Sequence, residues 1–270
     1  MQPVGRIPVL QPHGLLEAVT GEFNRDQYAD LIGIEKGTGR LWLYPGTGAG
    51  TWGPRKVVGS GWNGYRDLTV DRFNADAYDD LLAIELSTGS LWLYPGTATG
   101  TNWGSRGTNP VGHNWLGLER LTAGRFNGDA FDDVVAVERS TGKLRLYPGN
   151  GNSGWGTSTI IDASDWNALG AVARGRFDRD DYDDLIAVEK STGKVWLYPG
   201  VAGGGSFGSR VEIFGGGWTG RNELAAVRFD QNDYDDLVAG DAATGHVWVY
   251  PGTRSGGPAW GDPTEFGPIS

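Results

Sequence analysis

Short apolar runs and polar turns alternate along the chain in a pattern that returns about every fifty residues. In the second copy, the apolar run Leu81–Leu86 is separated from the next run, Leu91–Tyr94, by a Ser-Thr-Gly turn. An apolar run of this length predicts a strand that is covered on both faces, and the turn predicts an antiparallel return. Asp67–Phe73 before these runs and a weaker segment near Pro110–Val111 after them bring the expected number to four strands.

A phenylalanine marks the same place in each of five copies. The successive offsets between these phenylalanines are 50, 53, 51 and 52 residues, and the five are Phe23, Phe73, Phe126, Phe177 and Phe229. Five repeats of this length, each with four short strands, predict an all-β fold, a five-bladed β-propeller with four antiparallel strands per blade. Because the repeats fill almost the whole chain, we expect a single domain over residues 1–270.

The two ends of the chain bear on how the ring closes. Pro263–Gly267 aligns with Arg55–Gly59 of the first copy, so we expect it to supply the outer strand of the last blade. The lead-in Arg6–Gly14 is expected to pack beside the closure, where a proline is tolerated in an edge strand.

Composition agrees with this fold and excludes several classes of function. The 46 glycines, 12 tryptophans, 10 tyrosines and 9 phenylalanines suit short strands joined by tight turns and packed through rings. A net charge of −10 without a basic run argues against a nucleic-acid partner. The absence of cysteine excludes disulfides and zinc sites of the cysteine type.

Cellular location is only weakly constrained. No window reaches the roughly 18 apolar residues that span a bilayer, so we expect no membrane insertion. The N-terminus lacks the apolar region of a signal peptide. We expect a secreted protein whose leader is absent from this sequence, with a cytoplasmic location as the alternative.

A carboxylate-rich loop of nine positions follows the first expected strand of each copy. These acidic loops cover residues 22–30, 72–80, 125–133, 176–184 and 228–236. The unit resembles the FG-GAP or VCBS-type repeat of integrin-like and lectin-like propellers, over residues 15 to 262. The resemblance implies a calcium-binding loop with carboxylates at alternate positions, as in an EF-hand.

Two departures from that motif argue against calcium in most of the loops. Position one is arginine in four copies, and a guanidinium cannot bind a cation; position six lacks the glycine that permits the sharp turn. We therefore expect each arginine to replace the cation by pairing with the carboxylates at positions five and nine. The expected salt bridges join Arg72 to Asp76 and Asp80, Arg125 to Asp129 and Asp133, Arg176 to Asp180 and Asp184, and Arg228 to Asp236.

The first loop differs from the others, since position one is Glu22. We expect no metal or other cofactor in the protein, and calcium stays a weak alternative. The candidate ligands in this loop are Glu22, Asn24, Asp26 and Asp30.

A tryptophan recurs in four linkers between blades, 11 residues before the next anchor phenylalanine. An indole beside amide side chains suits a sugar, because one face of the sugar ring stacks while its hydroxyls form hydrogen bonds. The candidate carbohydrate-binding residues are Trp62, Asn63, Asn114, Trp115, Trp166, Asn167 and Trp218. The alternative is that these tryptophans only fill the gap between blades.

A second tryptophan stripe lies in the third strands, at Trp42, Trp92, Trp196 and Trp248. The third copy has Arg145 there, which indicates a half-exposed position. For this stripe we expect packing.

No catalytic arrangement is evident, and we expect a protein that is not an enzyme. The acids recur in every copy, whereas a catalytic pair is normally unique, and no serine stands in a nucleophile-elbow pattern. The leading hypothesis is a non-catalytic, lectin-like propeller that binds glycans or glycoconjugates at several equivalent inter-blade sites. The alternative is a protein-interaction or targeting scaffold of a secreted system, with other proteins as partners.

Overall fold

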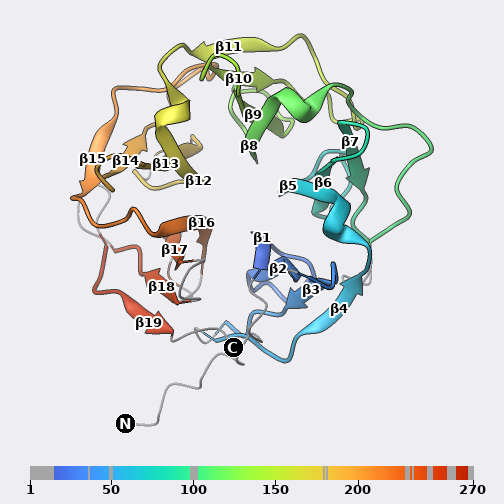
Figure 1. Ribbon diagram of the computed structural model, residues 1–270, viewed down its shortest axis with the longest axis horizontal. Helices are drawn as coiled ribbons and strands as arrows, with labels where there is room; N and C mark the ends of the chain where they lie inside the picture. Colours follow the sequence, from blue (N-terminus) through green and yellow to red (C-terminus); the bar gives the residue numbers. More distant parts are fainter. Residues whose placement is uncertain are drawn as a thin grey trace.

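The chain folds into five antiparallel sheets arranged as blades around a common centre (Figure 1), where the inner strands line a channel. The computed structural model describes residues 15–35, 37–48, 51–97, 103–178, 180, 182–228, 232, 234–241, 246–253 and 260–266. This arrangement confirms the predicted five-bladed, all-β propeller. No helix among the described residues is long and apolar enough to cross a membrane.

Each blade is built from one continuous stretch of chain. Blade one holds β1 (Leu15–Gly21), β2 (Asp30–Glu35), β3 (Leu41–Tyr44) and β4 (Lys56–Gly59). Blade two holds β5 (Tyr65–Asp71), β6 (Asp80–Glu85) and β7 (Ser90–Tyr94). Blade three holds β8 (Leu118–Gly124), β9 (Asp133–Glu138), β10 (Leu144–Tyr147) and β11 (Thr159–Asp162).

The last two blades follow the same order. Blade four holds β12 (Leu169–Gly175), β13 (Asp184–Glu189), β14 (Val195–Tyr198) and β15 (Val211–Phe214). Blade five holds β16 (Arg221–Val227), β17 (Asp236–Asp241), β18 (Val247–Tyr250) and β19 (Thr264–Phe266). Three linkers contain a 3₁₀ turn, η1 (Trp62–Gly64), η2 (Trp115–Gly117) and η3 (Trp166–Ala168).

The first strand of every blade lies at the channel, and the later strands follow outwards (Figure 1). β16 of blade five meets β1 of blade one, so the ring is closed by these two strands. The C-terminal segment pairs with β18 as β19, as the sequence predicts. The lead-in Arg6–Gly14, expected beside the closure, lies outside the described residues.

Blade two departs from the four-strand pattern, since its sheet has three strands. The weaker strand expected near Pro110–Val111 is reduced to an isolated bridge between Leu91 and Gly112. Gly104 and Gly112 lie eight positions apart, whereas the equivalent Gly53 and Gly59 lie six apart. The segment from Gly104 to Gly112 is two residues longer than its equivalent in blade one. It therefore does not pair along β7 and meets that strand only at its end, near Gly112.

The hydrophobic core lies between adjacent blades. One cluster joins Ile32, Ile34, Leu41 and Leu43 of blade one to Leu81 of blade two, and similar clusters follow around the ring. The anchor phenylalanines add ring contacts across these interfaces. The pairs are Phe23–Trp103, Phe73–Trp155, Phe126–Phe207 and Phe177–Trp260, with centroids 5.4 to 6.0 Å apart. Such contacts hold the acidic loop of one blade against the loop that follows the third strand of the next blade, on one face of the ring.

Candidate functional site

The aspartate at position nine anchors each acidic loop. Asp30, Asp80, Asp133, Asp184 and Asp236 are fully buried. In blade two, Asp80 Oδ2 accepts the N–H groups of Phe73 and Asn74, at 3.0 and 3.2 Å, and Asp80 Oδ1 accepts the N–H of Gly96 at 2.9 Å. Burial raises the pKa of Asp80 to about 6, against the opposing effect of these hydrogen bonds. One carboxylate therefore ties the loop to the Tyr-Pro-Gly turn of its blade.

An asparagine amide, and not an arginine, bonds the carboxylates at positions five and nine, and in the first loop it bridges both. Asn24 Nδ2 donates to Asp26 Oδ2 at 2.8 Å and to Asp30 Oδ1 at 3.2 Å. Asn74 makes the bond to position nine at 3.2 Å, and Asn127 makes the bond to position five at 2.9 Å. A neutral donor thus lies where the sequence analysis placed a guanidinium.

The arginines at position one pair instead with position eight, so the predicted partners were wrong. The Nε atoms of Arg72, Arg125, Arg176 and Arg228 lie 3.3 to 3.6 Å from an Oδ1 atom of Asp79, Asp132, Asp183 and Asp235, respectively. Among the described residues, none of these arginines forms an ion pair with Asp76, Asp80, Asp129, Asp133, Asp180, Asp184 or Asp236. The arginines remain about half exposed, with side-chain exposures of 45% to 61%.

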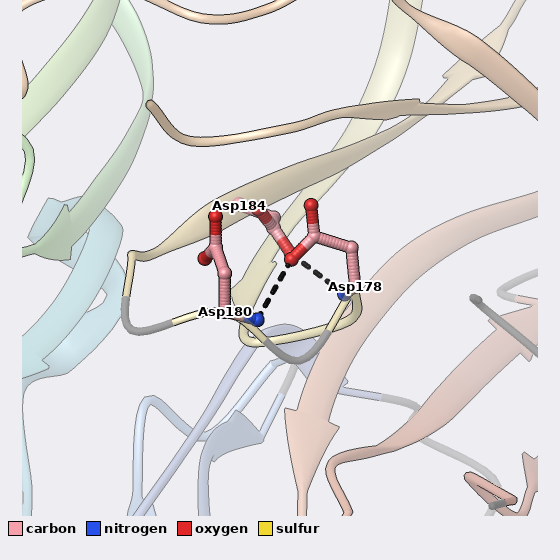
Figure 2. Close-up of side chains that lie close together, drawn as sticks. All are labelled: Asp178, Asp180 and Asp184. Carbon is pink, nitrogen blue, oxygen red and sulfur yellow. Dashed lines mark hydrogen bonds between the residues drawn. The ribbon is translucent and has the colours of Figure 1, made fainter. Parts of the chain in front are cut away.

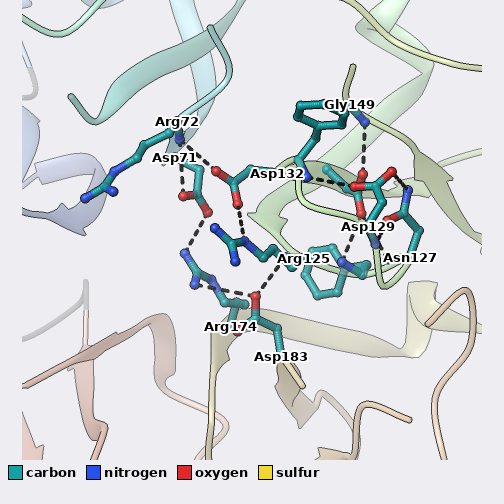
Figure 3. Close-up of polar contacts among 12 residues, drawn as sticks. Asp71, Arg72, Arg125, Asn127, Asp129, Asp132, Gly149, Arg174 and Asp183 are labelled. Carbon is teal, nitrogen blue, oxygen red and sulfur yellow. Dashed lines mark hydrogen bonds and ion pairs between the residues drawn. The ribbon is translucent and has the colours of Figure 1, made fainter. Parts of the chain in front are cut away.

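The position-eight aspartate also links adjacent blades. Asp79 Oδ2 accepts the N–H of Glu22 in the preceding blade at 2.8 Å, and Asp235 Oδ2 accepts the N–H of Arg176 at 2.8 Å. Asp132 and Asp183 do the same between the intervening blades (Figure 3). Blade one has Ala29 at this position, so the junction of blades five and one lacks this carboxylate. We call that junction the seam.

The fourth loop concentrates carboxylates, because Asp178 replaces the bridging asparagine (Figure 2). Ligand atoms of Asp178, Asp180 and Asp184 lie within 4.8 Å of one another. Asp184 Oδ2 accepts the N–H groups of Phe177 and Asp178, and Asp184 Oδ1 accepts that of Gly200. Burial, first, and the nearby Asp180 raise the pKa of Asp178. Calcium takes six to eight oxygens, and this set falls short of that number.

In the first loop, the weak calcium candidate, the side-chain oxygens accept hydrogen bonds mainly from N–H groups of the same loop. Glu22 Oε1 accepts the N–H of Gln27 at 3.1 Å, and Asp26 Oδ1 accepts the N–H of Tyr28 at 2.9 Å. Both oxygens of Asp30 likewise accept backbone N–H groups. These contacts leave few free oxygens, so this loop also fits calcium poorly.

An ion pair spans the channel near the acidic loops (Figure 3). Arg174 of blade four donates to Asp71 of blade two at 2.9 Å and lies 3.6 Å from Asp183. Burial raises the pKa of Asp71 to about 7, although the guanidinium of Arg174 opposes this effect. The channel itself has a volume of about 620 Å³. At the opposite mouth it is lined by Glu17, Asp67, Arg120 and Glu223, which occupy equivalent positions in their blades.

The linker tryptophans are core residues between blades. Trp62, Trp115, Trp166 and Trp218 are 0% to 5% exposed. Each ring packs 4.6 to 4.8 Å from a tyrosine of the next blade, with partners Tyr94, Tyr147, Tyr198 and Tyr250. Their ring faces are covered and cannot stack on an external sugar, which favours the packing alternative.

The amide neighbours of these tryptophans do not form a common groove. Asn63 and Asn114 are exposed, and Asn167 is half-buried. Asn167 donates through Nδ2 to the carbonyl of Arg139 at 3.1 Å, so it supports the neighbouring turn. The residues proposed from sequence for sugar binding are therefore not brought together around an open surface.

The second tryptophan stripe lies under arginines: Trp42, Trp196 and Trp248 are half-buried, and Trp92 is buried. The guanidinium carbons of Arg55, Arg106 and Arg210 lie 3.9 to 4.0 Å from the ring centroids of Trp42, Trp92 and Trp196. In blade three, Arg145 lies at the tryptophan position and pairs with Glu138 at 3.6 Å. These stacked pairs close the outer edges of the blades.

An open groove lies between blades one and two on the acidic-loop face. Its volume is about 410 Å³, and Tyr78 and Trp103 line it together with polar groups of Glu22, Gln27 and Arg72. An aromatic residue recurs at position seven of every loop, and Tyr78 is its copy in blade two; this position was not among the candidates predicted from sequence. The backbone N–H of Tyr78 donates to Asp76 Oδ1 at 2.8 Å, so the turn fixes where the ring emerges.

The equivalent gaps in the middle of the ring are occupied by backbone. Between blades two and three, the N–H of Ser153 donates to the carbonyl of Phe73 at 2.9 Å. Between blades three and four, the N–H of Gly205 donates to the carbonyl of Phe126 at 2.6 Å. The first interface thus has an open groove that these two interior interfaces lack, in contrast to the several equivalent sites expected from the repeats.

Comparison with known proteins supports the fold and leaves the family open. No protein-family model and no curated protein sequence matches the chain. A lectin from Agrocybe aegerita that recognises non-reducing terminal N-acetylglucosamine is similar in structure, with a TM-score of 0.54 and 14% identity. The match covers 93% of this chain and 66% of the lectin chain. A Photorhabdus luminescens Tc holotoxin pore also matches, with a TM-score of 0.48, 14% identity, and coverage of 98% of this chain and 13% of that one.

Proposed function

We propose that the protein is a non-catalytic, lectin-like propeller whose carbohydrate site is the groove between blades one and two. The groove itself carries the proposal, because it combines aromatic and polar side chains around a volume of about 410 Å³. Ligand sites of this kind are concave, with apolar walls and a few placed polar groups. The site lies on the acidic-loop face, opposite to the linker tryptophans.

The lining residues supply both kinds of contact that a sugar ring needs. Trp103 and the face of Tyr78 away from Arg25, whose guanidinium carbon lies 4.8 Å from the Tyr78 ring centroid, offer surfaces for the apolar face of a pyranose. The amide of Gln27, the carboxylate of Glu22 and the guanidinium of Arg72 offer acceptors and donors for its hydroxyls. Gln27 has a positive φ of 74°, a costly conformation that often marks a functional position.

The similarity to the Agrocybe aegerita lectin adds support at the level of architecture. That protein recognises terminal N-acetylglucosamine, and it shares the propeller fold at 14% identity. N-acetylglucosamine is therefore the first sugar to test on this chain.

A glycan array with matched variants tests the proposal. We expect selective binding by the wild-type protein and a loss of at least tenfold in affinity for Tyr78→Ala, since one stacking surface is removed. Tyr182→Ala removes the equivalent ring beside a filled gap and should bind as the wild type does. A blank array for folded wild-type protein, or equal loss in both variants, would contradict the proposal.

A protein-interaction scaffold is the second candidate. Leu86 and Leu116 are 44% and 45% exposed on the turn-and-linker face, and Leu116 packs beside the Gly89 turn. Exposed leucines of neighbouring blades suit an apolar partner surface. A blank glycan array, together with capture of a partner that Leu116→Ser abolishes, would favour this function.

A further inference from the structure

Two inter-blade grooves carry the same set of lining residues, but only one of them is open. The groove between blades one and two is lined by Phe23, Tyr78, Asp79, Thr97 and Trp103. The groove between blades four and five has the equivalent residues Phe177, Tyr234, Asp235, Thr253 and Trp260. Their volumes are about 410 and about 10 Å³.

The clearest difference at the entrance is loop position one of the preceding blade. This residue is Glu22 at the first groove and Arg176 at the second. The backbones of the two residues are fixed in the same way: the N–H of Glu22 donates to Asp79, and the N–H of Arg176 donates to Asp235, each at 2.8 Å. The two side chains can therefore be compared directly.

The two side chains take opposite directions. The carboxylate of Glu22 turns back on its own loop and accepts the N–H of Gln27 at 3.1 Å. The longer Arg176 extends to Asp183, with Nε 3.6 Å from Oδ1, and its side chain is 45% exposed. Blade one has Ala29 where blade four has Asp183, so the anchor that holds the arginine extended is absent beside Glu22.

We propose that the residue at loop position one controls access to these grooves, so that Glu22 leaves the first one open and Arg176 covers a second, latent carbohydrate site. This inference rests on the proposed carbohydrate-binding function. The other two interior gaps lack the full set, because Val201 and Phe207 replace threonine and tryptophan in one of them, and Phe131 and Asn150 replace tyrosine and threonine in the other.

The packing beside the two groove tryptophans also differs, and we expect this to limit the affinity of the second site. Behind the second groove, the ring centroid of Phe214 lies 5.8 Å from that of Trp260. Gly59 is its equivalent in blade one, since both residues pair with the first residue of the third strand. With the entrance opened, the second groove is shallower, and we expect binding there to be about tenfold weaker than at the first.

Reciprocal substitutions test the proposal on the intact protein. The probe is N-acetylglucosamine together with the sugar that gives the strongest wild-type signal on the array. With 5-fluorotryptophan incorporated, the resonances of Trp103 and Trp260, assigned through Trp103→Phe and Trp260→Phe, report each groove by ¹⁹F NMR. We expect the probe to shift only the Trp103 resonance in the wild type. Arg176→Ala and Arg176→Glu should add a shift of the Trp260 resonance at about tenfold higher probe concentration.

Changes at Glu22 complete the test. Glu22→Arg should cover the first groove and reduce the Trp103 response at least tenfold, whereas Arg125→Ala, a change at the same loop position beside a gap that backbone fills, should leave it within about threefold of wild type. The proposal is overturned if folded Arg176→Ala gives no Trp260 response at a hundred times the wild-type dissociation constant, or if Glu22→Arg binds like the wild type. A wild type that binds no sugar would refute the proposed function itself, which is a distinguishable result.

Discussion

At the scale of single residues, the acidic loops are organised by neutral amides between carboxylates. Asn24 donates to both Asp26 and Asp30, where a calcium loop would place a cation. An amide stabilises two carboxylates less than an ion does, but it needs no desolvation of a full charge. The fourth loop has Asp178 in this place and gathers three carboxylates.

This arrangement predicts opposite effects for two matched substitutions. Asn127→Asp removes the donor to Asp129 and adds a like charge, so we expect the free energy of unfolding to fall by about 1–3 kcal/mol. Asp178→Asn restores the amide found in the first three loops and should raise it by about 1 kcal/mol. Urea unfolding at pH 7 with EDTA measures both. Equal effects of the same sign would contradict the amide account.

The sequence contained a signal for the true partner of the position-one arginine. The four copies with arginine have aspartate at position eight, and the copy with Glu22 has Ala29 there. The resemblance to calcium loops pointed to the aspartates at positions five and nine instead. The oxygens of those aspartates already accept hydrogen bonds from backbone N–H groups and from the asparagine amide. Covariation among the repeats of this one chain would have identified the pair.

The same pair gives a second prediction at this scale. Asp132 accepts the N–H of Arg72 from the preceding blade and lies 3.3 Å from Arg125 Nε. Asp132→Ala removes this inter-blade hydrogen bond to a carboxylate, while Asp71 Oδ1 remains as a second acceptor of the Arg72 N–H at 3.2 Å, so we expect a loss of about 1–2 kcal/mol in unfolding free energy. Arg125→Ala removes only the half-exposed partner and should cost less than about 1 kcal/mol. Thermal unfolding of both variants checks the order, and a larger cost for Arg125→Ala would contradict it.

At the scale of elements, the apolar pattern was sufficient to place most of the strands. It did not predict that blade two lacks its outer strand. In blade two, β6 and β7 lie close to the bounds expected from Leu81–Leu86 and Leu91–Tyr94, because buried apolar runs and the Ser-Thr-Gly turn between them are local signals. The outer strand of blade two depends on the length of the loop that precedes it. The tryptophan linkers look like exposed grooves in sequence, yet they are core, since burial depends on the neighbouring blade.

The missing outer strand predicts a local loss of protection in β7. Leu91 is bonded to Gly112 at one end of the gap, and Gly104 is bonded to Pro95 at the other. Among the described residues, the N–H of Leu93 between them has no strand partner on the outer side. We expect its amide to exchange at least tenfold faster than that of Leu43, which pairs with Lys56. Hydrogen-exchange NMR measures both, and equal protection would contradict the assignment.

At the scale of the whole molecule, the ring is less uniform than its repeats suggest. Two features set the seam apart, namely Ala29 at position eight and the carboxylates of Glu17 and Glu223 on the two strands that meet there. Thr20 Oγ1 donates to the carbonyl of Ala226 across this junction at 2.8 Å. The open groove lies at the next junction, between blades one and two, and its Glu22 comes from the same first loop as Ala29.

The channel carboxylates predict how stability depends on pH. Burial, first, and the nearby Glu17 raise the pKa of Glu223 from 4.5 to about 7. The ionised form is therefore disfavoured in the folded protein, so this contribution to the unfolding free energy is fully present below pH 4.5 and is lost as the pH rises to about 7. Glu223→Gln should flatten this decline by about 1 kcal/mol, after allowance for solvent in the channel. Unchanged pH dependence in urea unfolding would contradict the assignment.

The candidate site belongs to this whole-molecule scale, which is why sequence alone missed it. Tyr78 and Trp103 come from one blade, whereas Glu22 and Gln27 come from the preceding one, and their meeting depends on how the blades pack. The repeat pattern suggested equivalent sites at every interface. In the structure, backbone fills the gaps between blades two and three and between blades three and four, whereas the gap between blades one and two is open. Interfaces that look alike in the repeats therefore differ.

A crystal structure of the protein with a bound saccharide tests the central claim most directly. The account predicts density for the sugar between blades one and two, with the ring against Tyr78 or Trp103 and its hydroxyls near Glu22 and Gln27. Density on the opposite face, beside the linker turns that contain Trp62 and Trp166, would contradict it.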